Sequence, residues 1–220
     1  MLRLEKVFKI YEMGEEKIFA LNSVDFTIKR NDFISILGPS GSGKSTLLSV
    51  IGLLDEPTSG AVYFDGVETN SLNEKERAHL RGKKIGFVFQ TFNLIPSLTV
   101  LENVSIPSLL YGEDEDVTNQ RAIVILDDIG MKERIFHYPN QLSGGQRQRA
   151  AIARSLINNP EMILADEPTG NLDLKTGQDV LSMFQKLHEE GKTILIITHD
   201  QNITKSTEKT IRISDGKIIG

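Results

Sequence analysis

The chain has 220 residues, of which 39% are hydrophobic and 25% charged, with a formal net charge of −5. This composition is typical of a globular protein, and the length suits one domain or a core with a satellite lobe. The negative charge excludes the global basic field that drives non-specific DNA binding, and the lack of cysteine excludes disulfides and thiolate metal sites.

The N-terminal part of the chain has the alternation of apolar and polar residues that is typical of strands. It is clearest at residues 24–28, and residues 61–64 are the expected partner in an antiparallel β portion. Four short apolar runs then predict parallel strands that are buried on both faces, with helices between them. These runs are residues 33–37, 85–89, 162–165 and 194–198.

Residues 98–156 have a mainly helical pattern, and their acidic run at residues 113–116 marks a solvated turn or a helix start. We therefore expect an α/β core, formed by residues 1–90 and 157–220, with an inserted helical subdomain at residues 91–156. No apolar stretch approaches the roughly 20 residues of a membrane-spanning helix, and the first residues do not form a secretory signal. We expect a cytoplasmic protein.

A phosphate-binding loop is predicted directly after the apolar run at residues 33–37. Residues 38–45 read GPSGSGKS and fit the pattern G-x-x-x-x-G-K-[ST], with a helical segment following. Main-chain amides in such a loop turn toward phosphate oxygens, so nucleotide binding is expected. The expected nucleotide-binding residues are Gly38, Pro39, Ser40, Gly41, Ser42, Gly43, Lys44, Ser45 and Thr46. Lys44 would also act in catalysis by placing a positive charge beside the β and γ phosphates, and Ser45 would ligate Mg²⁺.

The tetrapeptide Asp-Glu-Pro-Thr occurs twice, at residues 55–58 and 166–169. Asp55 lies at the end of the helix that follows the phosphate loop, about 16 Å from the phosphates, and we interpret it as a helix-end turn. Asp166 follows a buried strand whose carboxyl end opens onto the ligand crevice of an α/β sheet. We expect Asp166 to ligate Mg²⁺ and Glu167 to polarise the attacking water.

Gln90 and His199 end two other predicted strands. A polar residue after a strand is usually only part of a loop, so each is weak evidence by itself. Because the carboxyl ends of parallel strands meet at one edge of a sheet, both residues can join Asp166 and Glu167. Gln90 is then a ligand of Mg²⁺ and a contact of the water, and His199 is a contact of the γ phosphate.

Residues 142–146 read LSGGQ and open a strong helix former at residues 146–156. A serine and two glycines at a helix start form a second place to bind an anion. Together with the phosphate loop and Asp166-Glu167, this motif resembles the ATP-binding-cassette ATPases over essentially the whole chain. The resemblance implies a RecA-like P-loop NTPase core with a parallel sheet, an N-terminal antiparallel β subdomain and a helical subdomain.

The same resemblance implies a head-to-tail homodimer. Each ATP would lie between the phosphate loop of one copy and a group of residues from the other, namely Ser143, Gly144, Gly145 and Gln146. Ser143 could also simply cap its own helix, and the two roles can coexist. In the family's terms, Gln90, Asp166, Glu167 and His199 match the Q-loop glutamine, the Walker B aspartate, the adjoining glutamate and the H-loop histidine.

Two further assignments come from the resemblance alone. Asp173 matches the family's dimer-contact loop, although residues 170–173 read GNLD where SALD is commoner. Tyr11 matches the aromatic residue that stacks on adenine, whereas an ordinary core or surface tyrosine is the alternative.

Residues 52–60, 90–100 and 170–173 resemble the lipoprotein-release and macrolide-efflux branch of the family. That branch implies a separate multi-helix membrane permease as partner, with the ATPase peripheral on the inner face of the cell membrane. Apolar residues after Gln90 form either a groove for a partner helix or the lobe's own core. They are Phe92, Leu94, Ile95 and Leu98. The alternative function is a soluble cassette ATPase that acts on nucleic acid or ribosomes, although we expect no nucleic acid as a partner. A small-molecule kinase is a poorer alternative, because it leaves the LSGGQ motif unexplained.

Overall fold

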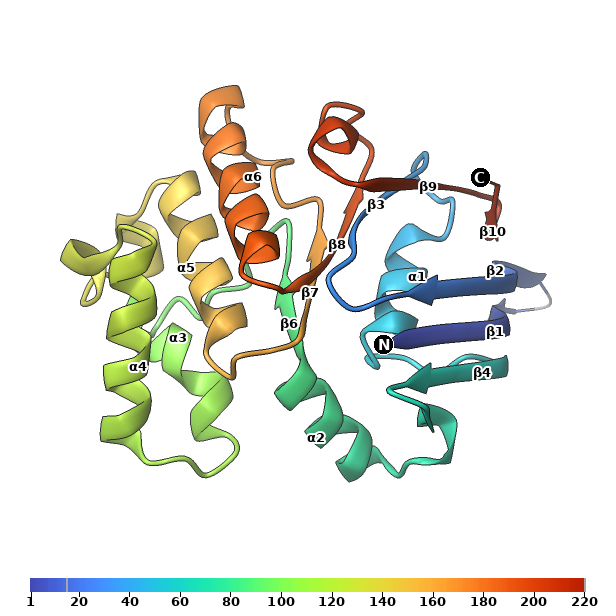
Figure 1. Cartoon of the computed structure of the whole chain (residues 1–220), viewed down its shortest axis with the longest axis horizontal. Coiled ribbons are helices and arrows are strands. Elements are labelled where there is room, and N and C mark those ends of the chain that lie inside the picture. Colours follow the sequence, from blue (N-terminus) through green and yellow to red (C-terminus); the bar gives the residue numbers. More distant parts are fainter. Residues whose placement is uncertain (15, 220) are drawn as a thin grey trace.

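The computed structural model describes residues 1–14 and 16–219, which form two sheets and a group of helices (Figure 1). The smaller sheet is antiparallel, with the strand order β2-β1-β4-β5. Its strands are β1 (Leu2–Met13), β2 (Glu16–Ile28), β4 (Ser59–Phe64) and β5 (Val67–Glu68). The expected partner at residues 61–64 pairs with residues 2–5 of β1, which separates it from residues 24–28 of β2.

The larger sheet has six strands in the order β10-β9-β3-β8-β7-β6. They are β3 (Phe33–Leu37), β6 (Ile85–Val88), β7 (Met162–Asp166), β8 (Thr193–Thr198), β9 (Lys209–Ser214) and β10 (Lys217–Ile218). All neighbouring pairs from β9 to β6 are parallel, and β10 is antiparallel to β9. Every residue of β8 is buried. The predicted apolar runs are therefore confirmed as strands, and they are continuously apolar because both faces of the sheet are covered.

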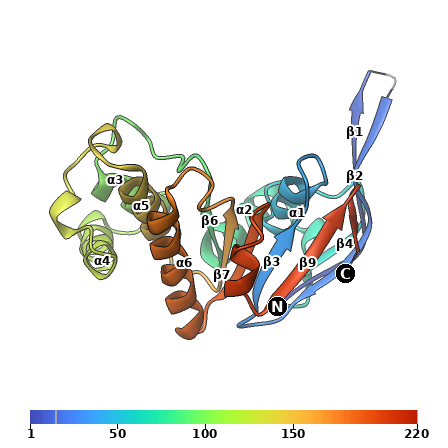
Figure 2. The ribbon, with the colours of Figure 1, turned by 90° about the horizontal axis from the view of Figure 1, so that it is seen from above.

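Residues 1–14 and 16–219 contain six α-helices. They are α1 (Lys44–Ile51), α2 (Glu74–Lys84), α3 (Val100–Leu109), α4 (Glu115–Asp128), α5 (Gly144–Leu156) and α6 (Leu174–Glu189), with short 3₁₀ turns at Thr69–Ser71, Lys132–Arg134, Pro139–Gln141 and Ile203–Ser206. Figure 1 and Figure 2 place α5 and α6 on one side of β7 and β8 and α1 on the other. Among the helices in residues 1–14 and 16–219, none has the length and apolar character that crossing a membrane requires.

Local sequence explains where several helices begin. Asn73 and Glu76 form a reciprocal capping box at α2, and Thr99 and Glu102 form another at α3. Asp114 caps α4 by accepting a hydrogen bond from the main-chain amide of Val117, so the acidic run is a helix start as expected. Each cap satisfies amides that the first helical turn leaves without partners.

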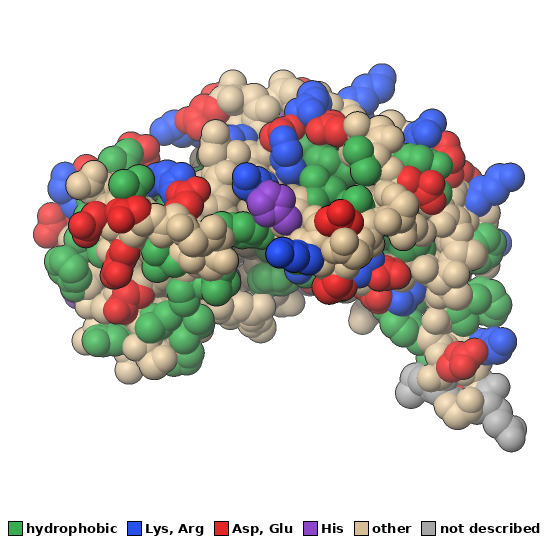
Figure 3. Space-filling view, turned by 90° about the horizontal axis from the view of Figure 1, so that it is seen from below, with side chains coloured by type: hydrophobic (Ala, Val, Ile, Leu, Met, Phe, Trp, Pro, Cys, Tyr) green, Lys and Arg blue, Asp and Glu red, His purple; other side chains and the backbone are tan. Residues whose placement is uncertain are grey.

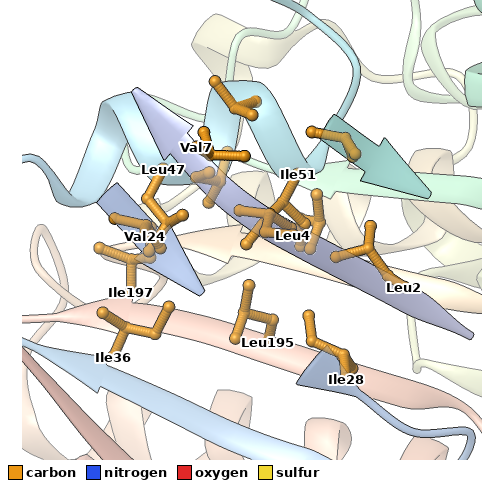
Figure 4. Packing of buried hydrophobic residues seen from close by; sticks show 14 of the residues in the cluster. Leu2, Leu4, Val7, Val24, Ile28, Ile36, Leu47, Ile51, Leu195 and Ile197 are labelled. Carbon is orange, nitrogen blue, oxygen red and sulfur yellow. The ribbon is translucent and has the colours of Figure 1, made fainter. Parts of the chain in front are cut away.

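The main core joins the two sheets across α1. Leu2 and Leu4 of β1 pack with Ile51 of α1 and with Leu195 and Ile197 of β8 (Figure 4). Both sheets therefore position α1, whose first residue is the lysine of the phosphate loop.

A separate core holds the helices α3, α4 and α5 together, and α5 belongs to two cores. Its Ala150 and Ala153 pack with Val104 of α3 and Leu126 of α4, whereas its Ile152 packs with residues of the larger sheet and α6. Helix α5 is thus the element through which the helical part of the chain contacts the sheet.

Candidate functional site

A cleft of about 930 Å³ lies at the carboxyl ends of β3, β7 and β8. Its volume suits a nucleotide, and this edge of an open parallel sheet is where ligands bind. The cleft brings together most of the residues that the sequence assigned to one nucleotide site. They are Ser40, Gly41, Gly43, Lys44, Ser45, Thr46, Gln90, Asp166, Glu167 and His199.

The phosphate loop has a conformation that requires glycine at Gly43. Its φ is 100°, and a Cβ at this position would lie 2.3 Å from the carbonyl oxygen of Ala20. The main chain of β2 therefore passes directly against the loop. The other side of the loop is braced by the turn between β9 and β10, where the amide of Gly216 donates to the carbonyl of Ser42 at 3.0 Å.

The loop offers hydrogen-bond donors to an anion. The buried Lys44 Nζ donates to the main-chain carbonyls of Gly38 and Pro39, both at 2.7 Å. The Ser42 Oγ is buried and has no hydrogen-bond partner among the described residues. An ammonium group held by neutral carbonyls and a hydroxyl without a partner both suit phosphate oxygens, which are strong acceptors.

Asp166 and Glu167 lie at the end of β7 and differ in environment. Burial raises the pKa of the Asp166 carboxyl, the charge of Glu167 raises it further, and Lys44 acts in the opposite direction. A bound divalent cation would stabilise the ionised form of this carboxylate. The oxygen atoms of Ser45, Gln90 and Asp166 in one cleft are the ligand type that Mg²⁺ prefers.

The Glu167 carboxylate is fixed by β8 and the residue that follows it. Thr198 Oγ1 donates to Oε2 at 3.2 Å, and His199 Nδ1 lies 2.7 Å from Oε1. An ionised carboxylate only accepts, so Nδ1 is the donor. The backbone of Glu167 is left-handed, with φ 46°, an uncommon conformation for a residue with a Cβ that tends to occur at functional sites.

The structure pairs His199 with Glu167, whereas the sequence assigned His199 only to the γ phosphate. The two contacts are compatible, because an imidazole has a second ring nitrogen and the His199 side chain is 68% exposed. This pairing was not predictable from the sequence, since the two residues are 32 positions apart.

Ser143 and Asp173 lie outside the cleft and cap helices in the single copy. The amide of Gln146 donates to Ser143 Oγ at 3.3 Å, and the amide of Thr176 donates to Asp173 Oδ1 at 3.1 Å. Gly144 and Gly145 form the first turn of α5 behind this cap. Ser143 is exposed, so its hydroxyl can meet a second molecule.

Tyr11 also lies outside the cleft. Its hydroxyl donates to Asp55 Oδ2 at 3.0 Å. The expectation that Asp55 ends the helix after the phosphate loop is wrong, because α1 already ends at Ile51 with Gly52 as its cap, and Asp55 lies in the turn beyond it. The aromatic residue that lines the cleft is Phe19 of β2, which is 49% exposed and lies beside Ile18. Phe19 was not predicted from the sequence, because the alternation of a strand does not reveal which aromatic residues face a ligand. Figure 2 shows the far ends of β1 and β2 projecting from the molecule.

The apolar residues after Gln90 do not form one groove. Leu94 packs against the helical core, the ring of Phe92 lies 5.5 Å from the guanidinium of Arg147, and Ile95 is 40% exposed. A separate apolar pocket of about 880 Å³ lies between α2 and the end of α3. Its lining includes Leu110, which is 81% exposed, and Tyr111.

Known proteins match both the sequence and the fold. A family model described as ABC transporter matches residues 21–170. An uncharacterized ABC transporter ATP-binding protein of Methanocaldococcus jannaschii, MJ1508, is 50% identical over 219 residues, which cover 100% of this chain and 98% of that protein. The macrolide export ATP-binding/permease protein MacB of Bartonella henselae is 48% identical over 100% of this chain, but the match spans only 33% of MacB.

A solved structure, described as a dimeric post-hydrolysis state of the ATP-binding cassette MJ0796 bound to ADP and Pi, superposes with a TM-score of 0.93. It is 48% identical in sequence, and the match covers 100% of this chain and 97% of that one. The sheet, the loop and the cleft define a P-loop ATPase of the α/β class. The chain belongs to the ABC transporter family, as an ATP-binding cassette ATPase, and the expected fold class is confirmed.

Proposed function

We propose that two copies of the chain close head to tail around two ATP molecules, hydrolyse them, and thereby drive a separate membrane permease. The observation that carries this proposal is the division of the site. The phosphate loop and the acidic residues share one cleft, while Ser143 lies exposed outside it. The start of α5 at Ser143 is a second place to bind an anion, and it cannot reach the ATP in the cleft of its own copy. It can complete the cleft of another copy.

In this proposal residues 38–46 bind the phosphates of ATP, and Lys44 exchanges its contacts with two loop carbonyls for contacts with the β and γ phosphates. Ser45, Gln90 and Asp166 would hold Mg²⁺, which neutralises phosphate charge when it is bound. Glu167 accepts a hydrogen bond from the attacking water, and His199 keeps the Glu167 carboxylate in place.

The dimer places Ser143, Gly144, Gly145 and Gln146 of one copy against the ATP in the cleft of its partner, with Asp173 near the contact. The relative MJ0796 is described as a dimer in its solved structures, including one with ADP and Pi, which supports this assembly by similarity. Phe19, and Tyr11 after release from Asp55, are the aromatic residues that we propose for the adenine.

A hydrolysis-deficient variant tests the dimer. Glu167→Gln keeps the shape of the side chain but removes the carboxylate, so ATP should persist and hold two copies together. We expect gel filtration with Mg-ATP to show a dimer for Glu167→Gln and a monomer for Glu167→Gln/Lys44→Ala. If only monomer appears for Glu167→Gln, even at high protein concentration and low salt, the proposal fails.

The pocket between α2 and α3 is the surface that we propose for the permease. Its lining is mainly apolar and includes Val67, Leu72, Leu80 and the exposed Leu110, together with the charged Lys75 and Glu76. Such a groove suits the apolar face of an amphipathic helix with charged flanks. The name of the relative MacB combines an ATP-binding part with a permease, which supports a permease as the class of partner. The protein would then lie in the cytoplasm, on the inner face of the membrane.

Two exposed apolar residues allow a matched test of this surface. Leu110→Glu should abolish co-purification with a multi-helix membrane protein from detergent-solubilised cells, and ATP binding should be unchanged. Val124→Glu on α4 is the control, because Val124 is also exposed but lies outside the pocket. Equal recovery of the membrane protein with both variants would exclude this pocket.

The alternative function, as a soluble cassette acting on nucleic acid or ribosomes, finds little support in the surface charge. Figure 3 shows acidic and basic side chains interspersed over one face, with apolar side chains between them in several places. ATPase activity stimulated by nucleic acid, without any membrane association, would decide for this alternative. The kind of cargo, whether exported or released from the membrane as a lipoprotein, follows the branch resemblance alone.

A further inference from the structure

We infer that Arg154 is a positioning residue that ties the loop carrying Gln90 to helix α5, so that one helix links the two ATP sites of a dimer. Ser143 begins α5 and serves the partner's ATP, and Arg154 near its other end holds a loop of its own copy's cleft. This inference rests on the proposed head-to-tail dimer.

The contact between Arg154 and the loop is made through two main-chain carbonyls. The guanidinium donates through Nη2 to the carbonyl of Phe92 at 2.8 Å and through Nη1 to the carbonyl of Asn93. Among the described residues, no carboxylate lies within ion-pair distance of Arg154. Burial lowers the pKa of Arg154, so a charged group has been taken out of water to make these two hydrogen bonds. Two parallel donors on a rigid plane are what only arginine supplies.

The loop needs to be held in its observed shape. Phe92 and Asn93 are consecutive residues with left-handed backbones, at φ 62° and 49°. This conformation is unfavourable for a residue with a Cβ and persists where surrounding contacts impose it. The carbonyls that Arg154 binds belong to these same two residues, so the cation stabilises the strained turn directly.

Two more contacts hold the loop. Arg147, two turns before Arg154 on the same face of α5, lies with its guanidinium 5.5 Å from the centre of the Phe92 ring. Asn171, in the loop after Glu167, donates its side-chain amide to the carbonyl of Gln90 at 2.9 Å. The loop that carries Gln90 is therefore attached to α5 through Phe92 and Asn93, and Gln90 itself is attached to the loop that follows Glu167.

Helix α5 can transmit a displacement because it is rigid and well packed. Ser143 and Arg154 are separated by about 16 Å of helix at the usual rise per residue. Between them Ala150, Ala151, Ile152 and Ala153 are fully buried against both cores of the protein. When the partner's ATP draws in Ser143, α5 moves as a body, and the Gln90 loop moves with it.

Arg154→Ala tests the inference through ATP binding, turnover and Mg²⁺ dependence, which a purely structural role of Arg154 would not affect differently. The phosphate loop is untouched, so binding of a fluorescent ATP analogue without Mg²⁺ should stay within about twofold of wild type. The turnover number should fall by about tenfold or more, and half-saturation should need more Mg²⁺, because Gln90 is displaced. Arg154→Lys, which keeps the charge but not the fork, should recover part of the turnover.

The link between sites has its own readout. Wild-type ATPase activity should rise cooperatively with ATP concentration, and Arg154→Ala should bring the Hill coefficient toward 1. Arg149→Ala is the control on the same helix, since Arg149 contacts the carbonyl of Ile129 and the carboxylate of Asp179 instead of the loop. Asn171→Ala, at an exposed position, should repeat the Mg²⁺ effect if Arg154→Ala does not fold.

The failures of the two proposals are distinguishable. If Glu167→Gln does not dimerise with Mg-ATP, the dimer itself is wrong. If it does dimerise, the inference is overturned by a folded Arg154→Ala with wild-type turnover, Mg²⁺ dependence and Hill coefficient, or by a wild-type Hill coefficient of 1. A loss in Arg149→Ala equal to that in Arg154→Ala would also overturn it.

Discussion

Alanine substitutions at two glycines of the phosphate loop can distinguish the cost of backbone strain from the cost of a steric clash. Gly41 and Gly43 both have positive φ, 78° and 100°, so alanine is strained at either position by about 1–2 kcal/mol. They differ in surroundings. A Cβ at Gly41 has no heavy atom within 4 Å, whereas one at Gly43 would lie 2.3 Å from the carbonyl oxygen of Ala20. Gly43→Ala must also displace main chain, which adds about 1–3 kcal/mol.

Denaturant unfolding without nucleotide measures this difference. We expect Gly41→Ala to lower the free energy of unfolding by about 1–2 kcal/mol and Gly43→Ala by about 2–5 kcal/mol. Since the displaced main chain is the phosphate loop against β2, Gly43→Ala should also weaken binding of a fluorescent ATP analogue. Equal destabilisation by the two substitutions, or wild-type ATP affinity in Gly43→Ala, would refute the close packing of β2 on the loop.

Three other predictions address the dimer, the adenine site and the ion pairs of Glu161. Ser143→Asp keeps a good helix cap but places a negative charge against phosphate, so it should fold normally and fail to dimerise with Mg-ATP. Ser143→Asn, a neutral cap, should dimerise. If both variants dimerise, Ser143 does not contact the nucleotide. Phe19→Ala should weaken ATP binding by about 1–3 kcal/mol, and Tyr11→Ala should weaken it without abolishing it; isothermal calorimetry showing no change in either variant would remove that residue from the adenine site. A hydrogen bond from Lys84 is the main cause that lowers the pKa of Glu161 below 4.5, while burial opposes it. The stability that comes from this lowered pKa is present above pH 4.5 and is lost as the pH falls through the pKa of Glu161 in the folded protein. Glu161→Gln should therefore be less stable than wild type at neutral pH, and the difference in unfolding free energy should disappear in acid. A gap in unfolding free energy that is independent of pH would contradict this assignment.

Local sequence was sufficient to predict the parts of the fold that depend on neighbouring residues. The apolar runs became β3, β6, β7 and β8, and the acidic run at residues 113–116 became the start of α4. The polar residues that follow these strands, such as Gln90 and His199, do line one cleft. Strand ends of a parallel sheet meet at one edge whatever the loops between them do, which is why this reasoning works.

Contacts between distant residues were not predictable in the same way. The pairing of His199 with Glu167, of Tyr11 with Asp55 and of Arg154 with the Phe92 carbonyl joins residues 32, 44 and 62 positions apart. No periodicity encodes such pairs, because they depend on how whole elements pack. The sequence therefore predicts which residue types lie at the strand ends, whereas their contacts with distant residues are revealed only by the folded chain.

The central claim, that each ATP site is built from two copies, is tested most directly by mixing two inactive variants. Lys44→Ala removes the phosphate-loop lysine, and Ser143→Asp removes the serine donated to the partner while keeping the cap of α5. A mixed dimer contains one site with both defects and one site with neither. We predict that each variant alone lacks ATPase activity and that the mixture regains it. A mixture as inactive as its components, with both proteins folded, would contradict the account.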